Sequence, residues 1–382
     1  MIDSRNFKDL RAQACKRLPR PIFEYIDRGT EDETSLRENR HAFERVRIAA
    51  QVLTGGAPRS SRITLFDQAL SAPLVVAPTA CAGLVWYRGE VRLAEAALQA
   101  GIPFCAATEA ITSIEDIAQA TDAANLWFQL YIWESEALSD DLIKRAQHLG
   151  IRTLVVTVDT PVIPNREYNI HNGMGMPLRL SPRLMVDVAA RPGWLLGVLG
   201  RYFIKGGAPS FANYPELYRK TIIGGGSKLQ MRHDPNLTWD HIARLRKSWK
   251  GYLVVKGIAR PADALKALDL GADGIVVSNH GGRNLDSSVA PMDTLEPISD
   301  AVADRLTILL DSGIQRGSDI FKALALGAKA VMVGRAFLYG TAIDGTQGAL
   351  HAYNLLQHEL DLTMGNAGCR SIDEITKAFV VR

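Results

Sequence analysis

Residues 274–286 read Gly-Ile-Val-Val-Ser-Asn-His-Gly-Gly-Arg-Asn-Leu-Asp, an apolar run followed directly by a polar loop. The run predicts a buried strand, and the loop supplies an imidazole, His280, and a guanidinium, Arg283. An imidazole can take up a proton near neutral pH, and a guanidinium can hold a carboxylate through two parallel hydrogen bonds. On this stretch alone, a strand-end turn with a capping His and a surface Arg explains the residues equally well.

Apolar runs of this kind recur along the chain. They lie at Pro73–Ala77, Pro103–Ala106, Leu126–Leu130, Thr153–Val158, Tyr252–Val255, Gly274–Val277, Thr307–Leu310 and Ala330–Val333. Most are almost continuously apolar, which is typical of parallel strands covered on both faces. Helical patterns lie between them, at Glu90–Ala100, Ser113–Ala120, Ser139–Leu149, Thr238–Ser248, Pro261–Leu270, Thr294–Val302 and Ser318–Leu326. The alternation predicts a (β/α)8 barrel, with a doubly wound open sheet as the alternative.

Polar groups follow every expected strand. In strand order they are Thr79, Thr108, Gln129 with Tyr131, Thr157 with Asp159, Lys256, His280, Asp311, and Gly334 with Arg335. Packing does not require so many polar strand ends, whereas a barrel builds its active site from residues at this end. The pattern therefore favours the barrel and places a site at its C-terminal face.

The last two strand ends indicate a phosphate site. Gly313 follows the seventh expected strand, and Gly334 with Arg335 follows the eighth, which is the usual position for phosphate in this architecture. No Gly-x-Gly-x-x-Gly loop opens a strand–helix unit, which argues against bound NAD. Lys256 ends the fifth expected strand, and a cation in a barrel mouth suits the negative charge of reduced FMN. A Schiff-base lysine in a non-redox isomerase or lyase is the alternative.

Composition sets limits on the class of protein. The chain has 382 residues and a formal net charge of +3, and its four cysteines form no CxxC pair, so we expect no metal site and no disulfide framework. No signal peptide and no apolar stretch long enough to span a bilayer is present, which predicts a cytoplasmic chain. We expect one domain over 1–382, with a helical segment at 1–70, a barrel at 71–382 and an insertion at 165–235.

The insertion is basic. Between Pro177 and Pro235 there are nine Lys or Arg and three Asp or Glu. The apolar run Trp194–Ile204 lies within it, too short and too polar to span a bilayer but suited to the headgroup region of an anionic membrane. The alternative is that this run packs on the barrel as a lid. If the insertion lies on a membrane, a membrane quinone is the expected electron acceptor. Nucleic acid is not an expected partner.

Several motifs carry a family resemblance. They are Ala-Pro-Thr-Ala at 77–80, Trp-Phe-Gln-Leu-Tyr at 127–131, Thr-Val-Asp-Thr-Pro at 157–161, Val-Lys-Gly at 255–257, Ser-Asn-His-Gly-Gly-Arg at 278–283 and Asp-Ser-Gly-Ile-Gln-Arg-Gly at 311–317. In these motifs nearly the whole chain resembles the FMN-dependent (S)-2-hydroxy acid dehydrogenases and oxidases. Residues 83–86 and 191–213 are most similar to the bacterial membrane-associated (S)-mandelate and L-lactate dehydrogenases.

The resemblance implies a role for each matching residue. His280 is the base, and Asp159 stabilises its imidazolium. Arg283, Arg166, Tyr25 and Tyr131 bind the substrate. The residues implied at the FMN are Thr79 and Ala80 at the flavin edge, Gln129 and Thr157 at the pyrimidine end, Lys256 near N1, Asp311 at the ribityl chain, and Gly313, Gln315, Gly334 and Arg335 at the phosphate. Thr108 and Ser278 are expected as further cofactor-binding residues.

Three positions depart from the family pattern. Most members have Arg where this chain has Gln315, so one phosphate contact is lost unless Arg316 or Arg335 compensates. Ala107 stands where Ser or Thr is common. Glu109 stands where many members carry an uncharged residue near the substrate's side chain, so it favours a polar or cationic substrate or points to solvent.

The expected function is the oxidation of an (S)-2-hydroxy acid, mandelate-like or lactate-like, to the 2-oxo acid, with FMN as cofactor and a quinone as acceptor. An oxidase that reduces O₂ is the first alternative, followed by a non-redox barrel and by a flavin-binding protein without turnover. We also expect a homotetramer that lies peripherally on the inner face of the cell membrane.

Overall fold

The computed structural model describes residues 2–55, 57–175, 177–179 and 181–382. The insertion expected over 165–235 is therefore described except at Met176 and Leu180, which lie outside the described residues.

Eight parallel strands close into a barrel in the order β10-β11-β4-β5-β6-β7-β8-β9. They are β4 (Leu74–Val76), β5 (Phe104–Ala107), β6 (Leu126–Leu130), β7 (Thr153–Thr157), β8 (Tyr252–Ile258), β9 (Gly274–Val277), β10 (Thr307–Leu310) and β11 (Ala330–Val333). All eight correspond to expected strands, and closure through the β11–β4 pair excludes the open sheet. The predicted (β/α)8 barrel is confirmed.

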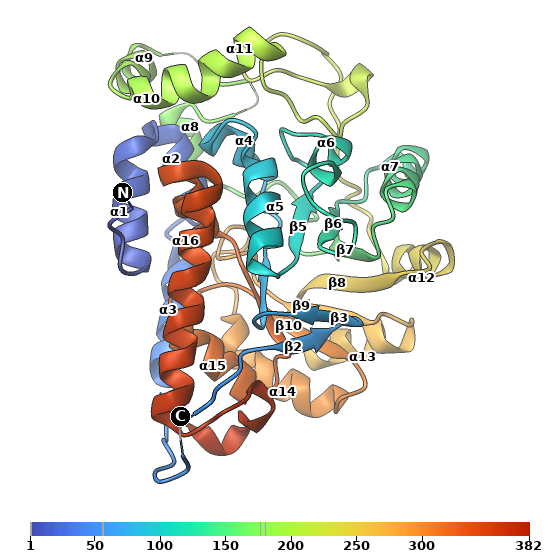
Figure 1. The fold of residues 1–382 in the computed structure, drawn as a ribbon. Helices are drawn as coiled ribbons and strands as arrows, with labels where there is room; N and C mark the ends of the chain where they lie inside the picture. The colour runs from blue at the N-terminus through green and yellow to red at the C-terminus, as the bar shows by residue number, and fades with distance from the viewer. Residues whose placement is uncertain (1, 56, 176, 180) are drawn as a thin grey trace.

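Helices surround the barrel (Figure 1). They are α5 (Gly89–Ala100), α6 (Ile114–Ala118), α7 (Glu136–His148), α12 (Trp239–Ser248), α13 (Pro261–Asp269), α14 (Pro291–Val302), α15 (Gly317–Ala325) and α16 (Arg335–Ala367). The first seven were expected from the sequence, with ends shifted by a few residues. The last was not: α16 joins two helical stretches across a kink at Asp344 and Gly345 and packs against α1, α5 and α15.

The N-terminal segment is helical only as far as Arg45. Its helices are α1 (Phe7–Arg17), α2 (Arg20–Asp27) and α3 (Thr34–Arg45). The expectation of a helical segment up to residue 70 is wrong beyond that point, because β1 (Arg47–Ile48) pairs with β12 (Val380–Val381) and β2 (Ile63–Leu65) forms a hairpin with β3 (Gln68–Leu70).

The hairpin closes the N-terminal end of the barrel. Its turn residues, Phe66 and Asp67, both have positive φ, of 48° and 57°, the conformation that a two-residue hairpin turn requires. The Phe66 ring packs against Trp127, with ring centroids 5.6 Å apart, and against Tyr252, at 4.9 Å. The opposite, C-terminal end of the barrel is thereby left as the place for a site.

The insertion lies over α4 (Ala82–Val85) and α2 at that opposite end, as the green segment of Figure 1 shows. Trp194 is buried and its indole Nε1 donates to the carbonyl of Leu84 at 2.6 Å, while the hydroxyl of Tyr202 accepts from the backbone N–H of Arg88 at 3.0 Å. One face of the Trp194–Ile204 run thus packs on the barrel. The helical pieces of the insertion are α8 (Glu167–Asn172), α9 (Pro182–Ala189), α10 (Pro192–Trp194), a π-helical turn (Leu195–Gly200), α11 (Arg201–Lys205) and a 3-10 turn (Glu216–Tyr218).

The other face of the insertion is apolar and exposed. Its exposed side chains include Met185, Val186, Leu196, Phe203 and Ile204. Among the described helices, none is both long enough and apolar enough to cross a membrane.

Candidate active site

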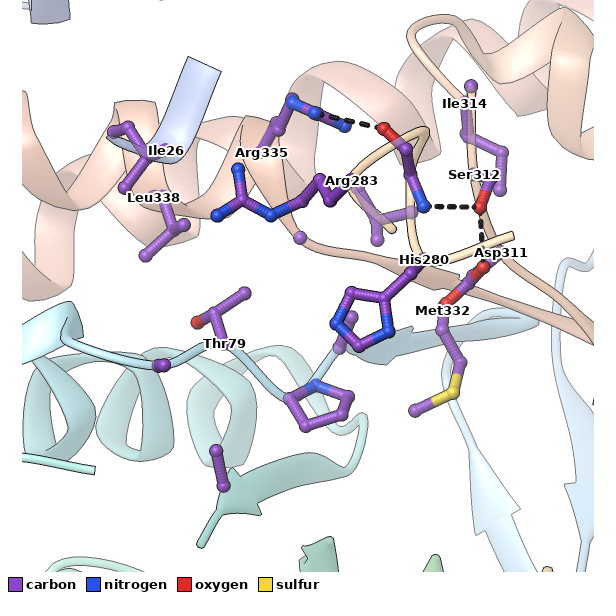
Figure 2. Close-up of a pocket in the computed structure, with 18 of the residues that line it drawn as sticks. Ile26, Thr79, His280, Arg283, Asp311, Ser312, Ile314, Met332, Arg335 and Leu338 are labelled. Carbon is purple, nitrogen blue, oxygen red and sulfur yellow. Dashed lines mark hydrogen bonds between the residues drawn. The ribbon is translucent and has the colours of Figure 1, made fainter. Parts of the chain in front are cut away.

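A cavity of about 190 Å³ opens at the C-terminal ends of the barrel strands. It collects residues from distant parts of the chain: Tyr25, Thr79, Ala80, Gln129, Tyr131, Thr157, Arg166, Lys256, His280, Arg283, Asp311, Gly313, Gln315, Gly334 and Arg335. Every residue predicted for the site lines this cavity except Asp159, Thr108 and Ser278, which lie behind its wall. Figure 2 shows the imidazole of His280 and the guanidinium of Arg283 on one side, with Thr79 across from them.

His280 is held from both sides. Its Nδ1 lies 2.9 Å from Oδ1 of Asp159, and its backbone N–H donates to the hydroxyl of Ser278 at 3.0 Å. The residue has a φ of 58°, a strained conformation that these contacts help to maintain. The remaining ring nitrogen, Nε2, lies 3.4 Å from the hydroxyl of Tyr131. The imidazole therefore presents Nε2 beside the cavity.

The charges of this pair suit a base. Burial lowers the pKa of His280 below its ordinary value, although Asp159 acts in the opposite direction. Burial alone would raise the pKa of Asp159, but the charge of His280 and its hydrogen bond outweigh burial and lower that pKa. Asp159 is thus an ionised acceptor, Nδ1 carries the proton, and Nε2 of the neutral imidazole is free to take up another.

Gly257 allows Asp159 to approach this closely. It lies after Lys256 at an irregularity in the pairing of β8 with β9, with a φ of 110°. A Cβ at this position would lie 2.6 Å from Cβ of Asp159. Any side chain here would displace the carboxylate, which explains a Gly directly after Lys256 in the sequence.

Two partly buried arginines line the cavity without an ion-pair partner among the described residues. Arg283 donates to the carbonyls of Tyr25, at 2.6 Å, and Arg28, at 3.0 Å, and its guanidinium lies over the Tyr25 ring. Arg166 donates to the carbonyl of Arg283 at 3.2 Å. Burial and the neighbouring charge of Arg283 lower the pKa of Arg166. Two partly buried cations whose hydrogen-bond partners are neutral form a site for an anion.

Lys256 has a carboxylate partner. Its ammonium lies 2.8 Å from Oδ2 of Asp311 and donates to the hydroxyl of Ser278 at 3.0 Å. Burial would lower the pKa of Lys256, but Asp311 and Asp159 outweigh burial and raise it. The side chain therefore remains an ammonium. Because a Schiff base requires a neutral amine, this geometry argues against the isomerase or lyase alternative.

The far end of the cavity suits a phosphate. Arg335 is the first residue of α16. Within the described part of the chain, its guanidinium donates only to carbonyls, those of Asp27, Arg28 and Gly281. Burial lowers the pKa of Arg335, although the charge of the neighbouring Asp27 acts in the opposite direction. Gly313 has a φ of 91°, and a Cβ there would lie 2.6 Å from the carbonyl of Asn39. A cation at a helix N-terminus whose hydrogen-bond partners are carbonyls is a typical anion site.

The comparisons with known proteins agree with this geometry. The model of the family "FMN-dependent dehydrogenase" matches residues 14–382. The chain belongs to the FMN-dependent dehydrogenase family. It is 38% identical to an L-lactate dehydrogenase of Pectobacterium atrosepticum over 98% of this chain and 96% of that protein. It is 36% identical to the (S)-mandelate dehydrogenase of Pseudomonas putida, over 98% and 93% respectively. A crystal structure of a monotopic membrane protein, (S)-mandelate dehydrogenase, matches with a TM-score of 0.91 at 35% identity, over 99% of both chains.

The cavity residues fit the FMN of this family. The hydroxyl of Thr79 is buried without a hydrogen-bond partner among the described residues, as expected for a group that meets a ligand. A Cβ on Gly334 would lie 3.3 Å from Cγ2 of Thr79, so that glycine keeps the passage between them open. With FMN bound, Arg335 would provide a cation for its phosphate, and Lys256 would provide one deeper in the barrel.

Three residues named in the sequence analysis, Arg316, Thr108 and Ser278, do not line the cavity. Arg316 does not line the cavity: it pairs with Glu359 at 3.2 Å, so it cannot compensate for Gln315. Thr108 donates to the carbonyl of Gln129 at 2.8 Å, and Gln129 donates in turn to Thr157 at 3.0 Å. Thr108 and Ser278 therefore support residues of the cavity wall, and their contact with FMN stays a prediction.

Glu109 lines the cavity and does not point to solvent. Its Oε1 accepts from the hydroxyl of Tyr214 at 3.0 Å and lies 3.3 Å from Nε2 of His233. His233 also stacks on Tyr131, with ring centroids 4.3 Å apart. Tyr214 and His233 were not expected from the sequence, because both lie in the insertion, whose path no motif or periodicity indicates.

Proposed function

We propose that this FMN-dependent dehydrogenase oxidises an (S)-2-hydroxy acid to the corresponding 2-oxo acid. The proposal rests on one observation: a base and two anion-binding cations line the same cavity. The base is His280, paired with Asp159, and the cations are Arg283 and Arg166. A base and a carboxylate clamp are the groups required to bind and deprotonate such an acid. The names of the two relatives, which refer to lactate and mandelate, support this substrate class.

In this proposal the arginines orient the substrate. Arg283 and Arg166 hold its carboxylate, and the hydroxyls of Tyr25 and Tyr131 bind its polar atoms. Burial raises the pKa of both tyrosines, so they remain hydrogen-bond donors at neutral pH. The fixed carboxylate leaves the hydroxyl and the α-carbon facing His280.

His280 then takes up a proton at Nε2. The imidazolium that forms is stabilised by the Asp159 carboxylate at Nδ1, 2.9 Å away. When bound, FMN supplies the acceptor for the two electrons and the second proton that leave the substrate. Thr79, Ala80, Gln129, Thr157 and Lys256 would hold its ring, Asp311 its ribityl chain, and Gly313, Gln315, Gly334 and Arg335 its phosphate.

We further propose that the insertion rests on the anionic inner face of the cell membrane and that a membrane quinone is the acceptor. The exposed apolar side chains of residues 185–204 stand among the basic residues of the insertion, a combination suited to anionic lipid. The (S)-mandelate dehydrogenase of the matched crystal structure is itself a monotopic membrane protein.

We also propose that the protein forms a homotetramer. Further exposed apolar side chains support this assembly, namely Val162, Ile163, Leu285 and Val289. Light scattering in detergent would test it.

The proposed function is tested by steady-state assay. The FMN-loaded protein is offered (S)-lactate, (S)-mandelate, glycolate and longer 2-hydroxy acids, with an artificial dye or a quinone as acceptor. We expect formation of the 2-oxo acid and reduction of the acceptor, with little peroxide in air. Rapid peroxide formation would make the protein an oxidase, and no turnover of any 2-hydroxy acid would overturn the proposal.

A further inference from the structure

We propose that Glu109 selects substrates whose side chain carries a hydrogen-bond donor, so that the preferred substrate is an (S)-2-hydroxy acid bearing a hydroxyl or amino group. This inference rests on the proposed function and adds the substrate class to it. It begins from a carboxylate placed in the same cavity as His280, Arg166 and Arg283.

The position of Glu109 is fixed by its backbone. It lies in the turn after β5, where its carbonyl accepts from the N–H of Cys81 at 3.3 Å and the N–H of Ala110 donates to the carbonyl of Ala107 at 3.2 Å. Its side chain is 23% exposed and lines the cavity. The carboxylate is therefore held at the wall, where a substrate's side chain can reach it.

Only one of the two carboxylate oxygens is used by the protein. Oε1 accepts from Tyr214 and lies beside His233, whereas no residue in the described part of the chain forms a hydrogen bond to Oε2. An ionised carboxylate can accept several hydrogen bonds, so Oε2 has unused capacity. A hydrogen-bond donor on the side chain of the substrate would use this capacity of Oε2.

The carboxylate is ionised. Burial alone would raise the pKa of Glu109, but the contacts with His233 and Tyr214 and the charge of Arg166 outweigh burial and lower it. An apolar substrate side chain that covers this charge would remove its remaining contact with water without replacing it, which is costly. A second carboxylate on the substrate would be repelled. A hydroxyl or ammonium group avoids both penalties.

The insertion holds the partners of Glu109 rigidly. The N–H of Asp234 donates to the carbonyl of Ile132 at 2.9 Å, and the N–H of Glu134 donates to the carbonyl of Arg232 at 3.1 Å, so His233 is anchored on both sides. The Tyr214 ring packs edge-on against Trp133, with centroids 5.4 Å apart. The carboxylate of Glu109 is thus preorganised, and a substrate can form the hydrogen bond to it without the entropic cost of ordering the site.

The test compares matched substrates with the FMN-loaded enzyme. Each pair consists of an (S)-2-hydroxy acid ending in a hydroxyl group and its isostere ending in methyl, over a series of chain lengths. At the best length, we expect kcat/KM to favour the hydroxyl member by about 10- to 100-fold, the range of a charge-assisted hydrogen bond. Glu109→Leu should abolish or reverse this preference, and Glu109→Gln should improve turnover of (S)-malate, whose second carboxylate is no longer repelled.

Binding gives a second readout that does not depend on turnover. Calorimetric titration with the corresponding 2-oxo acids should show the same preference in the wild type and its loss in Glu109→Leu. The control is Glu136→Gln, an exposed carboxylate in the first turn of α7 and outside the cavity, which should leave both preferences unchanged. Equal kcat/KM and equal affinity within every pair, unaffected by Glu109→Leu, would overturn the role of Glu109 while leaving the proposed function standing. Failure of the wild type to oxidise any 2-hydroxy acid would overturn both.

Discussion

Oδ1 of Asp159 lies 2.9 Å from Nδ1 of His280, although 121 positions separate the two residues in the chain. They follow β7 and β9, and β8 runs between these strands with Gly257 as the residue that leaves room for the contact. The contact assigns the proton of the neutral imidazole to Nδ1 and makes Nε2 the basic atom. The barrel thus brings together two residues from distant sequence motifs, and their contact orients the base.

The pH dependence of kcat/KM should have an acid limb below about pH 6.5, the ordinary pKa of His, because burial lowers the pKa of His280. The imidazole is the active base only above its pKa, so activity falls as the pH decreases through that value. Asp159 acts to raise this pKa, and Asp159→Asn should therefore move the limb to lower pH and reduce kcat about 10- to 100-fold. A limb that moves to higher pH in this variant would contradict the assignment.

Replacing the base should separate cofactor binding from catalysis. His280→Gln should retain FMN, since the residues expected to hold the phosphate and ring are untouched. Reduction by substrate should slow by about 10²- to 10⁴-fold, the usual cost of removing a general base. Flavin content by absorbance and anaerobic reduction rates measure the two effects, and near-normal reduction in the variant would exclude His280 as the base.

Arg283→Lys should damage substrate binding and rate together. A lysine supplies one point charge in place of two parallel N–H donors, and it also loses the hydrogen bonds that Arg283 makes to the carbonyls of Tyr25 and Arg28. We expect kcat/KM to fall about 10- to 100-fold. Lys144→Arg, an exchange of the same two residue types on the exposed face of α7, is the matched control and should be neutral.

Gln315→Arg should tighten FMN binding. Gln315 lines the cavity near Arg335, and Arg316 is occupied by Glu359, so the wild type lacks one phosphate contact that the family resemblance implies. A restored charge-assisted hydrogen bond should lower the FMN dissociation constant by about 10- to 100-fold. Fluorescence titration of the apoprotein measures it, with Gln315→Leu as the uncharged control. An unchanged dissociation constant would show that the phosphate lies elsewhere.

Membrane association should depend on the exposed face of the insertion. Changing Leu196, Phe203 and Ile204 to Ser should reduce co-sedimentation with anionic vesicles without loss of dye reduction, because these side chains point away from the barrel contacts of Trp194. Leu53→Ser, at an exposed apolar residue outside the insertion, is the control and should sediment like the wild type. Sedimentation should also weaken with salt. Equal sedimentation of all three proteins would remove the membrane proposal.

The barrel strands were predictable because most of them are short, almost continuously apolar runs. Four of them, among them Gly274–Val277, have the bounds in the structure that the sequence pattern predicts. The helix α16 was missed because its glycines resemble helix breakers. In the structure they permit close packing: a Cβ on Gly340 would lie 2.2 Å from the carbonyl of Gly348.

The candidate site was predictable wherever its residues stand at strand ends, as His280, Lys256 and Asp311 do. Contacts supplied by the insertion were not, because no periodic pattern indicates where its chain returns to the barrel. Glu109 was recognised as unusual, but its partners Tyr214 and His233 became evident only from the structure. Likewise, only the structure shows that Arg316 is engaged by Glu359.

The central claim is that an (S)-2-hydroxy acid, held in this cavity, delivers its electrons to FMN with His280 as the base. The most direct measurement is rapid mixing of the FMN-loaded protein with the (S) and (R) enantiomers of one 2-hydroxy acid under nitrogen, followed by flavin absorbance. We predict that the (S) acid bleaches the flavin, that the (R) acid does so far more slowly, and that His280→Gln largely abolishes bleaching by the (S) acid. A flavin that stays oxidised with every 2-hydroxy acid, or a His280→Gln variant that bleaches as fast as the wild type, would contradict the account.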